Sequence, residues 1–268
     1  MPKTRTKPSC SPKDACAVVI AAGQGTRMRS DLPKIVHPLG GLPMVGHVLE
    51  VCRRLGVKRT LVVIGYRAER VREVLAAYPV EFVLQEDQRG TAHAVLQTEA
   101  SLRGFEGDVL VLNGDVPLLS DALVQRLLTT HAESRAVATA VTTRLADPSG
   151  YGRVLRDRRG GFRGIVEEVE ATSAERRVKE INAGIYCFSA PRLFEALHQV
   201  RPSAVKGELY LPEVLAILLK EKWRIATVLA DDAREVLGIN TRAELAEAYG
   251  VLRRRVVDRL MEAGVTCL

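Results

Sequence analysis

Short apolar runs alternate with amphipathic segments along most of the chain. The runs are rich in Val, Ile, Leu and Ala, which is typical of strands buried on both faces, and they occur at 17–21, 60–65, 80–84, 109–113 and 136–141. Between them, apolar residues recur with the spacing of one helix face at 42–55, 67–77, 91–101 and 121–132. This alternation predicts an α/β fold with a mainly parallel sheet covered by helices.

Residues 147–190 break the alternation. The segments DPSGYGRV, DRRGGFRG and INAGIY place glycines and other turn-forming residues between short apolar stretches. We expect hairpins or a lobe at the sheet edge, carrying one side of a pocket. Helical spacing returns at 191–198 and 210–221, a strand is predicted near 224–230, and 241–263 predicts a long charged helix.

Length and composition restrict the class of protein. The chain has 268 residues, and at roughly 150 residues per domain this suggests one or two domains. Its 47% hydrophobic and 26% charged residues exclude a mostly disordered chain, a collagen and a small disulfide scaffold. Residues 1–14 are rich in Pro, Ser and Lys without periodicity, which predicts a disordered basic arm. We therefore expect this arm, one α/β domain over 15–240 and a C-terminal helix within 241–268.

Cysteine usage and hydropathy indicate the compartment. The five cysteines form no C-x-x-C pair and no cluster with zinc-ligand spacing, which favours reduced thiols in a cytoplasmic protein. No apolar run approaches the roughly 18 residues that cross a bilayer, so no membrane partner is expected. Residues 15–22 follow the basic arm as a short signal peptide would, but their Val and Ile content and the glycine-rich turn after them favour a buried strand.

The net charge of +7 suits an anionic partner. Charge alone does not choose between a small molecule and a nucleic acid. Aromatic residues make up 4% of the chain, which is few for a platform that stacks single-stranded bases. The arginine triplet at 253–255 lies among acidic residues of the predicted C-terminal helix, which favours a solvated face. We expect no nucleic-acid partner.

A glycine-rich turn, GQGTRM at 23–28, follows the first predicted strand directly. At the carboxyl edge of such a sheet, backbone N–H groups of a glycine turn can approach an anion closely. Met28 replaces the third glycine of a dinucleotide fingerprint, and no Gly-Lys-Ser/Thr follows as in a Walker A loop. A turn without a ligand is the alternative. Lys34 follows the stiffening Pro33, and together with Arg27 and the glycine turn it predicts a polyphosphate clamp.

Asp115 directly follows the fourth predicted strand, in LNGDVP at 112–117. A carboxylate at a strand's carboxyl end suits Mg²⁺, which binds one or two carboxylates together with substrate phosphates. Capping of the following turn is the alternative for Asp115. Asn240, in GINTR at 238–242, could return to the same sheet edge. Taken alone, Asn240 is more typical of a helix N-cap.

These motifs resemble the nucleotide-sugar pyrophosphorylase superfamily. AAGQGTRM…DLPK, VLQEDQRGTAHA, LNGDVPL, GYGRV, GIVEE, INAGIY and GINTR occur in the order of that family between about residues 17 and 268. Within the superfamily, the chain is most similar to the bacterial N-acetylglucosamine-1-phosphate uridylyltransferases. The resemblance implies a Rossmann-like sheet of the nucleotide-diphospho-sugar transferase type, flanked by helices, with a small β-rich sugar-binding lobe at about 147–190. It also implies that UTP and N-acetylglucosamine-1-phosphate are the substrates, with Mg²⁺ as cofactor.

The resemblance further implies a role for each matching position. The nucleotide would be lined by Ile20, Ala21, Ala22 and Gly23, and uracil would be read by Gln85, Gly90 and Thr91. Arg27 and Lys34 would be the catalytic residues that hold the triphosphate. The sugar phosphate would be contacted by Gly114, Gly152, Glu167 and Asn182, and Mg²⁺ would be bound by Asp115 and Asn240. Asn113 and Asn240 would also belong to the substrate-binding residues. The family usually has an aromatic residue at the position of Asn113, so packing beside the sugar is expected to differ.

Two other functions are compatible with the motifs. One is a nucleotidyltransferase for a different sugar-1-phosphate or nucleotide, and the other is a module that binds nucleotide-sugars without turnover. The presence of Arg27, Lys34 and Asp115 weighs against the second. The family's second half, a trimeric β-helix that carries an acetyltransferase, has no counterpart in this sequence. We therefore expect no acetyltransferase activity, and the sequence leaves the oligomeric state open.

Overall fold

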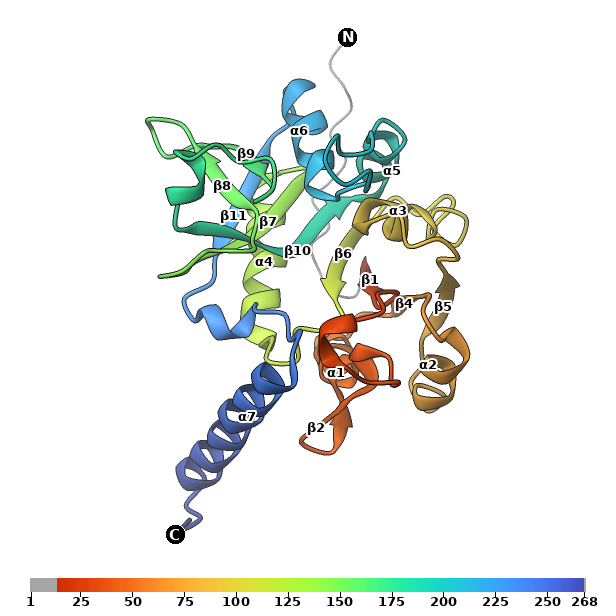
Figure 1. Cartoon of the computed structure of the whole chain (residues 1–268), viewed down its shortest axis with the longest axis vertical. Coiled ribbons are helices and arrows are strands. Elements are labelled where there is room, and N and C mark those ends of the chain that lie inside the picture. The colour runs from red at the N-terminus through yellow and green to blue at the C-terminus, as the bar shows by residue number, and fades with distance from the viewer. Residues whose placement is uncertain (1–13, 268) are drawn as a thin grey trace.

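A large mixed sheet forms the centre of the structure, a computed structural model that describes residues 14–267 (Figure 1). Its main path has the strand order β11-β7-β10-β6-β1-β4-β5. These strands are β1 (Ala15–Ile20), β4 (Arg59–Ile64), β5 (Glu81–Leu84), β6 (Asp108–Asn113), β7 (Ala138–Arg144), β10 (Glu180–Ser189) and β11 (Ile225–Leu229). Within this path β10 is antiparallel to both of its neighbours, and the other described neighbours are parallel. The mainly parallel sheet predicted from the alternation is therefore confirmed.

Helices cover both faces of the sheet. Along β1, Ala17 and Val19 pack into one hydrophobic cluster, whereas Cys16 and Val18 pack into another, because successive side chains of a strand point to opposite faces. The first cluster contains side chains from α1 (Met44–Arg54), α2 (Ala68–Val74) and α4 (Asp121–Ser134). The second contains side chains from α3 (Thr91–Leu96), α5 (Ala190–Leu197) and α6 (Pro212–Lys220). A strand with a core on each side must be apolar throughout, which explains the unbroken apolar runs.

The segment 147–190 is only partly a peripheral lobe. Strands β8 (Arg153–Arg156) and β9 (Phe162–Val166) form an antiparallel hairpin, as the turn signals predicted. Strand β10 instead lies in the middle of the main sheet between β6 and β7. Tyr186 and Phe188 in β10 are almost fully buried. The structure thus differs from the expected edge lobe, because the apolar half of this strand fills the sheet interior.

Two helices have different limits from those predicted. The helix expected over 42–55 begins at Met44, because residues 42–43 form the short strand β3 (Leu42–Pro43) that pairs with β2 (Pro38–Leu39). Gly40 and Gly41 connect these strands with φ values of 56° and 92°, as a two-residue hairpin turn requires. The helix expected over 91–101 ends at Leu96 and continues as turns.

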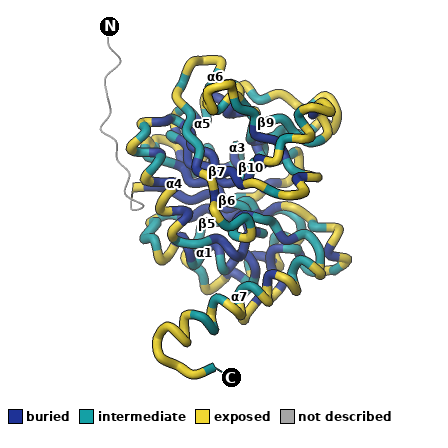
Figure 2. Tube along the Cα trace, turned by 90° about the vertical axis from the view of Figure 1, so that its left-hand side faces the viewer, coloured by how far each residue is buried: buried dark blue, intermediate teal, exposed yellow. Residues whose placement is uncertain are grey.

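The long helix α7 (Arg242–Glu262) extends away from the sheet (Figure 1). Its outer part is largely exposed (Figure 2). Arg255 donates to the carbonyl oxygen of Leu118 at 2.6 Å, and Arg254 pairs with Asp258 at 2.8 Å. Two of the three arginines at 253–255 therefore make contacts with other groups of the protein. None of the described helices combines the length and the apolar composition that crossing a membrane requires. The predicted basic arm lies outside the described residues except for Asp14.

Helix α4 provides a test of this packing. Leu127 has 0% exposure and belongs to the cluster on the α1 side of the sheet. Leu127→Ala should lower the free energy of unfolding by about 2–5 kcal/mol through lost burial and a residual cavity. Gln125→Ala, at an exposed position of the same helix, should change it by less than about 0.5 kcal/mol. Urea denaturation measures both values, and equal effects would contradict the packing described.

Candidate functional site

The carboxyl ends of β1 and β6 lie side by side. Ile20 and Asn113, the last residues of these strands, are opposite each other in the register. The N–H of Gly114 donates to the carbonyl oxygen of Ile20 at 2.9 Å. A Cβ atom on Gly114 would lie 3.2 Å from that oxygen, so glycine permits this close approach. Open α/β sheets bind ligands at such strand ends.

The glycine-rich turn after β1 exposes its middle and buries its end. Ala21 and Ala22 are buried, whereas Gly23 and Arg27 are exposed. Gly25 has a φ of 68°, and a Cβ atom there would lie 2.4 Å from Cβ of Lys34, so both conformation and space require glycine. Met28, at the end of the turn, is 1% exposed and anchors it. The turn therefore presents backbone and a cationic side chain to solvent.

The ammonium group of Lys34 joins the two predicted metal ligands. Its Nζ donates to the carboxylate of Asp115 and, at 2.9 Å, to Oδ1 of Asn240. The side chains of Lys34 and Asp115 are 12% and 20% exposed. Lys34 is 81 residues from Asp115 and 206 from Asn240 in the sequence. The fold thus collects three predicted site residues at one point.

Asn240 is positioned beside the helix rather than capping it. Thr241 is the N-cap of α7, and its hydroxyl accepts from the N–H of Glu244 at 3.1 Å. The carboxylate of Glu244 accepts from the backbone N–H groups of Asn240 and Thr241. A Cβ atom on Gly238 would lie 3.2 Å from both carboxylate oxygens of Asp115. The interpretation of Asn240 as a helix cap is therefore wrong, and the T-x-x-E capping box was the missed sequence signal.

The atoms at this point suit a hard divalent cation. A carboxylate and an amide oxygen, which are hard oxygen ligands, converge from the end of β6 and the start of α7. The ammonium of Lys34 shows that they accept a cation in common. Asp115 and Asn240 thus fit a metal that takes its remaining ligands from phosphate groups or water.

The three residues predicted to read uracil form one cluster. Gln85, which is 3% exposed, donates through its side-chain amide to the carbonyl oxygen of Gly90 at 3.2 Å. Gly90 has a φ of 112°, and a Cβ atom there would lie 2.5 Å from the carbonyl oxygen of Leu209. The hydroxyl of Thr91 accepts from the N–H of Leu211 at 2.9 Å. The structure brings these residues together, and their contact with uracil stays a prediction.

Gly152, Glu167 and Asn182 meet where the β8–β9 hairpin joins β10. A Cβ atom on Gly152 would lie 3.2 Å from Oε1 of Glu167, and the carbonyl oxygen of Gly152 accepts from the N–H of Asn182 at 2.9 Å. Burial raises the pKa of Glu167; Glu170 and Glu208 raise it further, against the effect of Lys206. This position therefore favours a protonated carboxyl more than an exposed glutamate would.

Asn113 and Asn182, both predicted to bind substrate, form hydrogen bonds with an irregular stretch of β10. In this stretch the register with β7 shifts between Asn182 and Tyr186. The side-chain amide of Asn182 donates to the hydroxyl of Tyr186 at 2.6 Å, and its oxygen accepts from the N–H of Gly184 at 3.2 Å. Asn113 donates to the carbonyl oxygen of Gly184 at 3.2 Å. Both amides are thus engaged within the protein, and their roles toward a sugar stay predictions.

Tyr151 is a further candidate for the site, which the sequence motifs did not single out. Burial raises the pKa of its hydroxyl, Glu244 and Asp115 raise it further, and Arg27 lowers it. These charges belong to the metal-ligand side and to the glycine turn, so Tyr151 lies in the field of both. Its place within GYGR was the available signal.

The buried side chain of Arg153 holds the backbone of Tyr151 in place. It is 1% exposed, and its guanidinium donates to the carbonyl oxygen of Tyr151 and, at 3.3 Å, to that of Arg176. It also pairs with Glu168 at 2.6 Å. Arg153, the arginine of the GYGR motif, therefore has a structural role, which is to position Tyr151.

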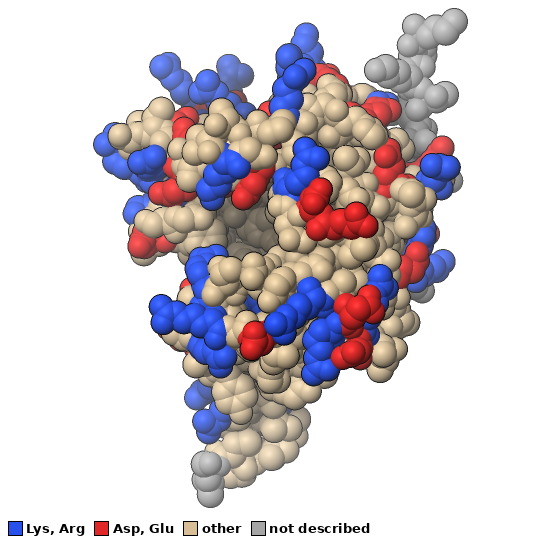
Figure 3. Space-filling model, turned by 45° about the vertical axis from the view of Figure 1, so that its right-hand side comes forward, with Lys and Arg blue, Asp and Glu red and all other residues tan. Residues whose placement is uncertain are grey.

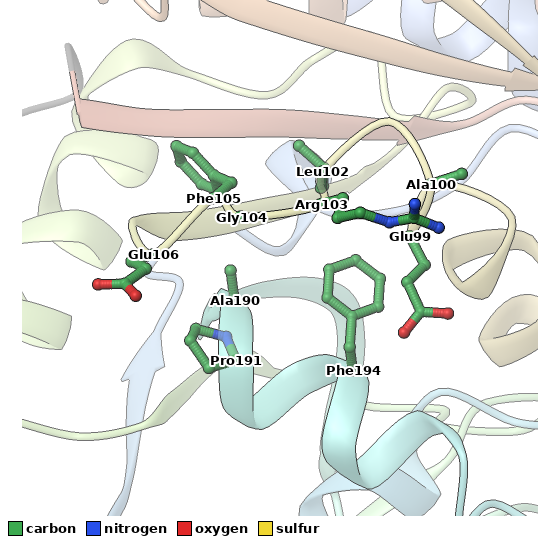
Figure 4. Close-up of a pocket in the computed structure, with 10 residues that line it drawn as sticks. All are labelled: Glu99, Ala100, Leu102, Arg103, Gly104, Phe105, Glu106, Ala190, Pro191 and Phe194. Atoms are coloured by element: carbon green, nitrogen blue, oxygen red, sulfur yellow. The ribbon is translucent and has the colours of Figure 1, made fainter.

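Two surface hollows lie apart from these residues. One of about 490 Å³ is lined by the turns after α3 and by the start of α5, where Figure 4 shows Pro191 and Phe194 facing the turn at 102–105. The other, of about 510 Å³, is lined by residues of β8 and β9 and by the segment before β10. Neither contains a predicted site residue. Figure 3 shows a further deep hollow near the middle of the molecule, with acidic and basic side chains around it.

A sequence profile of the MobA-like NTP transferase domain matches residues 17–209. The chain belongs to this family. Its matched part includes the glycine turn, Lys34, Asp115 and the β8–β9 hairpin. The NTP transferase domain thus contains most of the residues described above, and Asn240 follows it in the sequence.

Longer curated proteins are similar to this NTP transferase chain. It is 48% identical over 250 residues to the bifunctional protein GlmU of Listeria monocytogenes, covering 93% of this chain and 54% of that protein. It is 46% identical over 256 residues to the bifunctional protein GlmU of Pelotomaculum thermopropionicum, covering 95% and 56%. The chain spans about half the length of these relatives.

The fold also matches a solved structure. The crystal structure of UDP-glucose pyrophosphorylase complexed with UDP-glucose has a TM-score of 0.71 over 90% of this chain and 98% of that one, at 17% sequence identity. At this identity the likeness concerns the fold, and it confirms the predicted Rossmann-like architecture.

The environment of Glu167 predicts a pH effect. The pKa of Glu167 is raised in the folded protein. Above about pH 4.3, where a glutamate of the unfolded chain loses its proton, the native state therefore binds more protons than the unfolded chain. The free energy of unfolding consequently falls as the pH rises from about 4.3 to the pKa of Glu167 in the folded protein. Glu167→Gln removes this loss, so its stability relative to the wild type should be greater at pH 7 than at pH 4. Urea unfolding at both values measures this. Glu247→Gln, at an exposed position, is the control, and a pH-independent difference for Glu167→Gln would contradict the prediction.

Proposed function

We propose that this chain transfers a uridylyl group from UTP to N-acetylglucosamine-1-phosphate, with Mg²⁺ as the metal. The observation that carries the proposal is the meeting of Asp115 and Asn240 oxygens at one cation position beside the glycine turn. Membership of the NTP transferase family supports nucleotidyl transfer. The motifs shared with N-acetylglucosamine-1-phosphate uridylyltransferases, and the similarity to proteins named GlmU, support the choice of substrates.

The proposed reaction is a direct displacement at phosphorus. A phosphate oxygen of the sugar-1-phosphate attacks the α-phosphorus of UTP, and the bond from that phosphorus to the oxygen bridging the β-phosphate breaks. The products are UDP-N-acetylglucosamine and pyrophosphate. The reaction requires no covalent enzyme intermediate. The protein has to hold two mutually repelling anions in line and to stabilise the charge at phosphorus.

Each group of residues has a separate task in this proposal. The backbone of the glycine turn and Arg27 bind the triphosphate, and the ammonium of Lys34 neutralises the departing pyrophosphate. Asp115 and Asn240 would hold Mg²⁺, which when bound would supply positive charge to stabilise the phosphate groups. Uracil contacts the cluster of Gln85, Gly90 and Thr91, and the sugar contacts the region of Gly152, Glu167 and Asn182.

Pyrophosphate release tests the proposal. UTP, CTP, dTTP and ATP are each combined with Mg²⁺ and with N-acetylglucosamine-1-phosphate, glucosamine-1-phosphate or glucose-1-phosphate. We expect release with UTP and the acetylated sugar, and none without the metal. Release with another pair would support the alternative nucleotidyltransferase. Absence of release from folded protein with every pair would support the non-catalytic binding module.

Substitutions at the central cluster test the mechanism. Asp115→Asn and Lys34→Met should each lower kcat by about 100-fold, because each removes a charge that stabilises the transition state. Circular dichroism checks that both variants are folded. Arg254→Met, in an exposed pair on α7, should retain wild-type turnover. A kcat near the wild-type value for either cluster variant would exclude that residue from the mechanism.

A further inference from the structure

Lys34 stands where the proposed metal would bind. Its ammonium contacts both Asp115 and Asn240, and these are the two oxygen-bearing side chains that fit a divalent cation. The ammonium fills the position between Oδ2 of Asp115 and Oδ1 of Asn240, and a metal that takes both atoms as ligands would occupy the same space and be repelled by its charge. The ammonium therefore has to leave before a metal enters.

The shape of Lys34 allows such a movement. Its backbone follows the buried Pro33 and begins a short 3-10 turn, Lys34–Val36, which fixes the base of the side chain. Its aliphatic stem lies against Gly25, where a Cβ atom would contact Cβ, Cγ and Cδ of the lysine. A lysine ammonium is carried on a flexible four-carbon chain. The group can thus move between Asp115 and the glycine turn without any change in the main chain.

We propose that the ammonium of Lys34 occupies the metal position in the substrate-free protein and is exchanged for the divalent cation when the triphosphate binds. This inference rests on the proposed function, because it takes Asp115 and Asn240 as metal ligands and the glycine turn as the triphosphate site. It assigns Lys34 two successive partners: the carboxylate of Asp115 before binding, and the phosphates afterwards.

The exchange has a thermodynamic consequence. In the metal-free protein, Lys34 compensates the charge of the largely buried Asp115, whose side chain is 20% exposed, so a metal must compete with an established ion pair. The triphosphate attracts the ammonium and thereby frees the oxygens. By linkage, the nucleotide strengthens metal binding and the metal strengthens nucleotide binding. The free protein should therefore bind a divalent cation weakly.

Mn²⁺ binding without nucleotide tests this inference. The electron paramagnetic resonance signal of free Mn²⁺ gives the Kd for the wild type, Lys34→Met, Asp115→Asn and the double variant. Methionine retains the stem that packs on Gly25 and removes the competing charge. Lys34→Met should bind Mn²⁺ about tenfold more tightly than the wild type, and the double variant should lose this gain.

Arg27→Met is the matched charge control. Arg27 belongs to the same turn but is exposed, and exposed charges interact weakly. Its loss should change the Kd for Mn²⁺ in the absence of nucleotide by less than about threefold. A gain as large as that of Lys34→Met would mean that net charge rather than the contact controls metal affinity, and would overturn the exchange.

Thermal unfolding gives a second measurement. Mn²⁺ should raise the Tm of Lys34→Met more than that of the wild type, and Lys34→Gln serves if the methionine variant does not fold. Equal Mn²⁺ affinity of Lys34→Met and the wild type, with binding lost in Asp115→Asn, would overturn the exchange and leave the proposed metal site intact. Mn²⁺ affinity unaffected by Asp115→Asn in either background would overturn both the exchange and the metal placement.

Discussion

The negative charge of Asp115 at the end of β6 is the constraint on which the site depends. A carboxylate with little access to water is costly unless a positive charge and hydrogen bonds compensate it. Lys34 supplies the charge from one loop, and Asn240 completes the cluster from another. Both loops must approach closely, so the surrounding positions are small: Gly25 lies under the lysine stem and Gly238 under the carboxylate.

The central sheet fixes the positions from which these loops approach each other. Buried parallel strands hold the ends of β1 and β6 in register, and the N–H of Gly114 ties the two loops that leave them. The antiparallel β10 brings the β8–β9 hairpin to the same region, where the buried Arg153 secures Tyr151. A nucleotidyl transfer needs two anions held in line. A rigid sheet edge with loops on both sides of it can hold them in this way.

Much of the fold was predictable because it depends on local patterns. Buried parallel strands require continuous apolar runs, and the strands of the sheet core were found within a few residues. The failures concern competing local interactions or distant pairing. The Gly40–Gly41 hairpin delays the start of α1, and Thr241 with Glu244 takes the capping role that was the alternative for Asn240. The place of β10 between β6 and β7 depends on pairing with strands far away in the sequence, which periodicity does not report.

The sequence by itself determined which residues are candidates for the chemistry, because a glycine turn after the first strand, a lysine after proline and a carboxylate after a buried strand are each recognisable from neighbouring residues. The tertiary structure alone decided how they combine. Lys34 was expected beside Arg27 on a triphosphate, yet its ammonium lies against Asp115 and Asn240, 81 and 206 residues away. Such a contact depends on where the fold brings charges together, because a charge pairs with whichever opposite charge is nearest in space, and no local pattern records that distance.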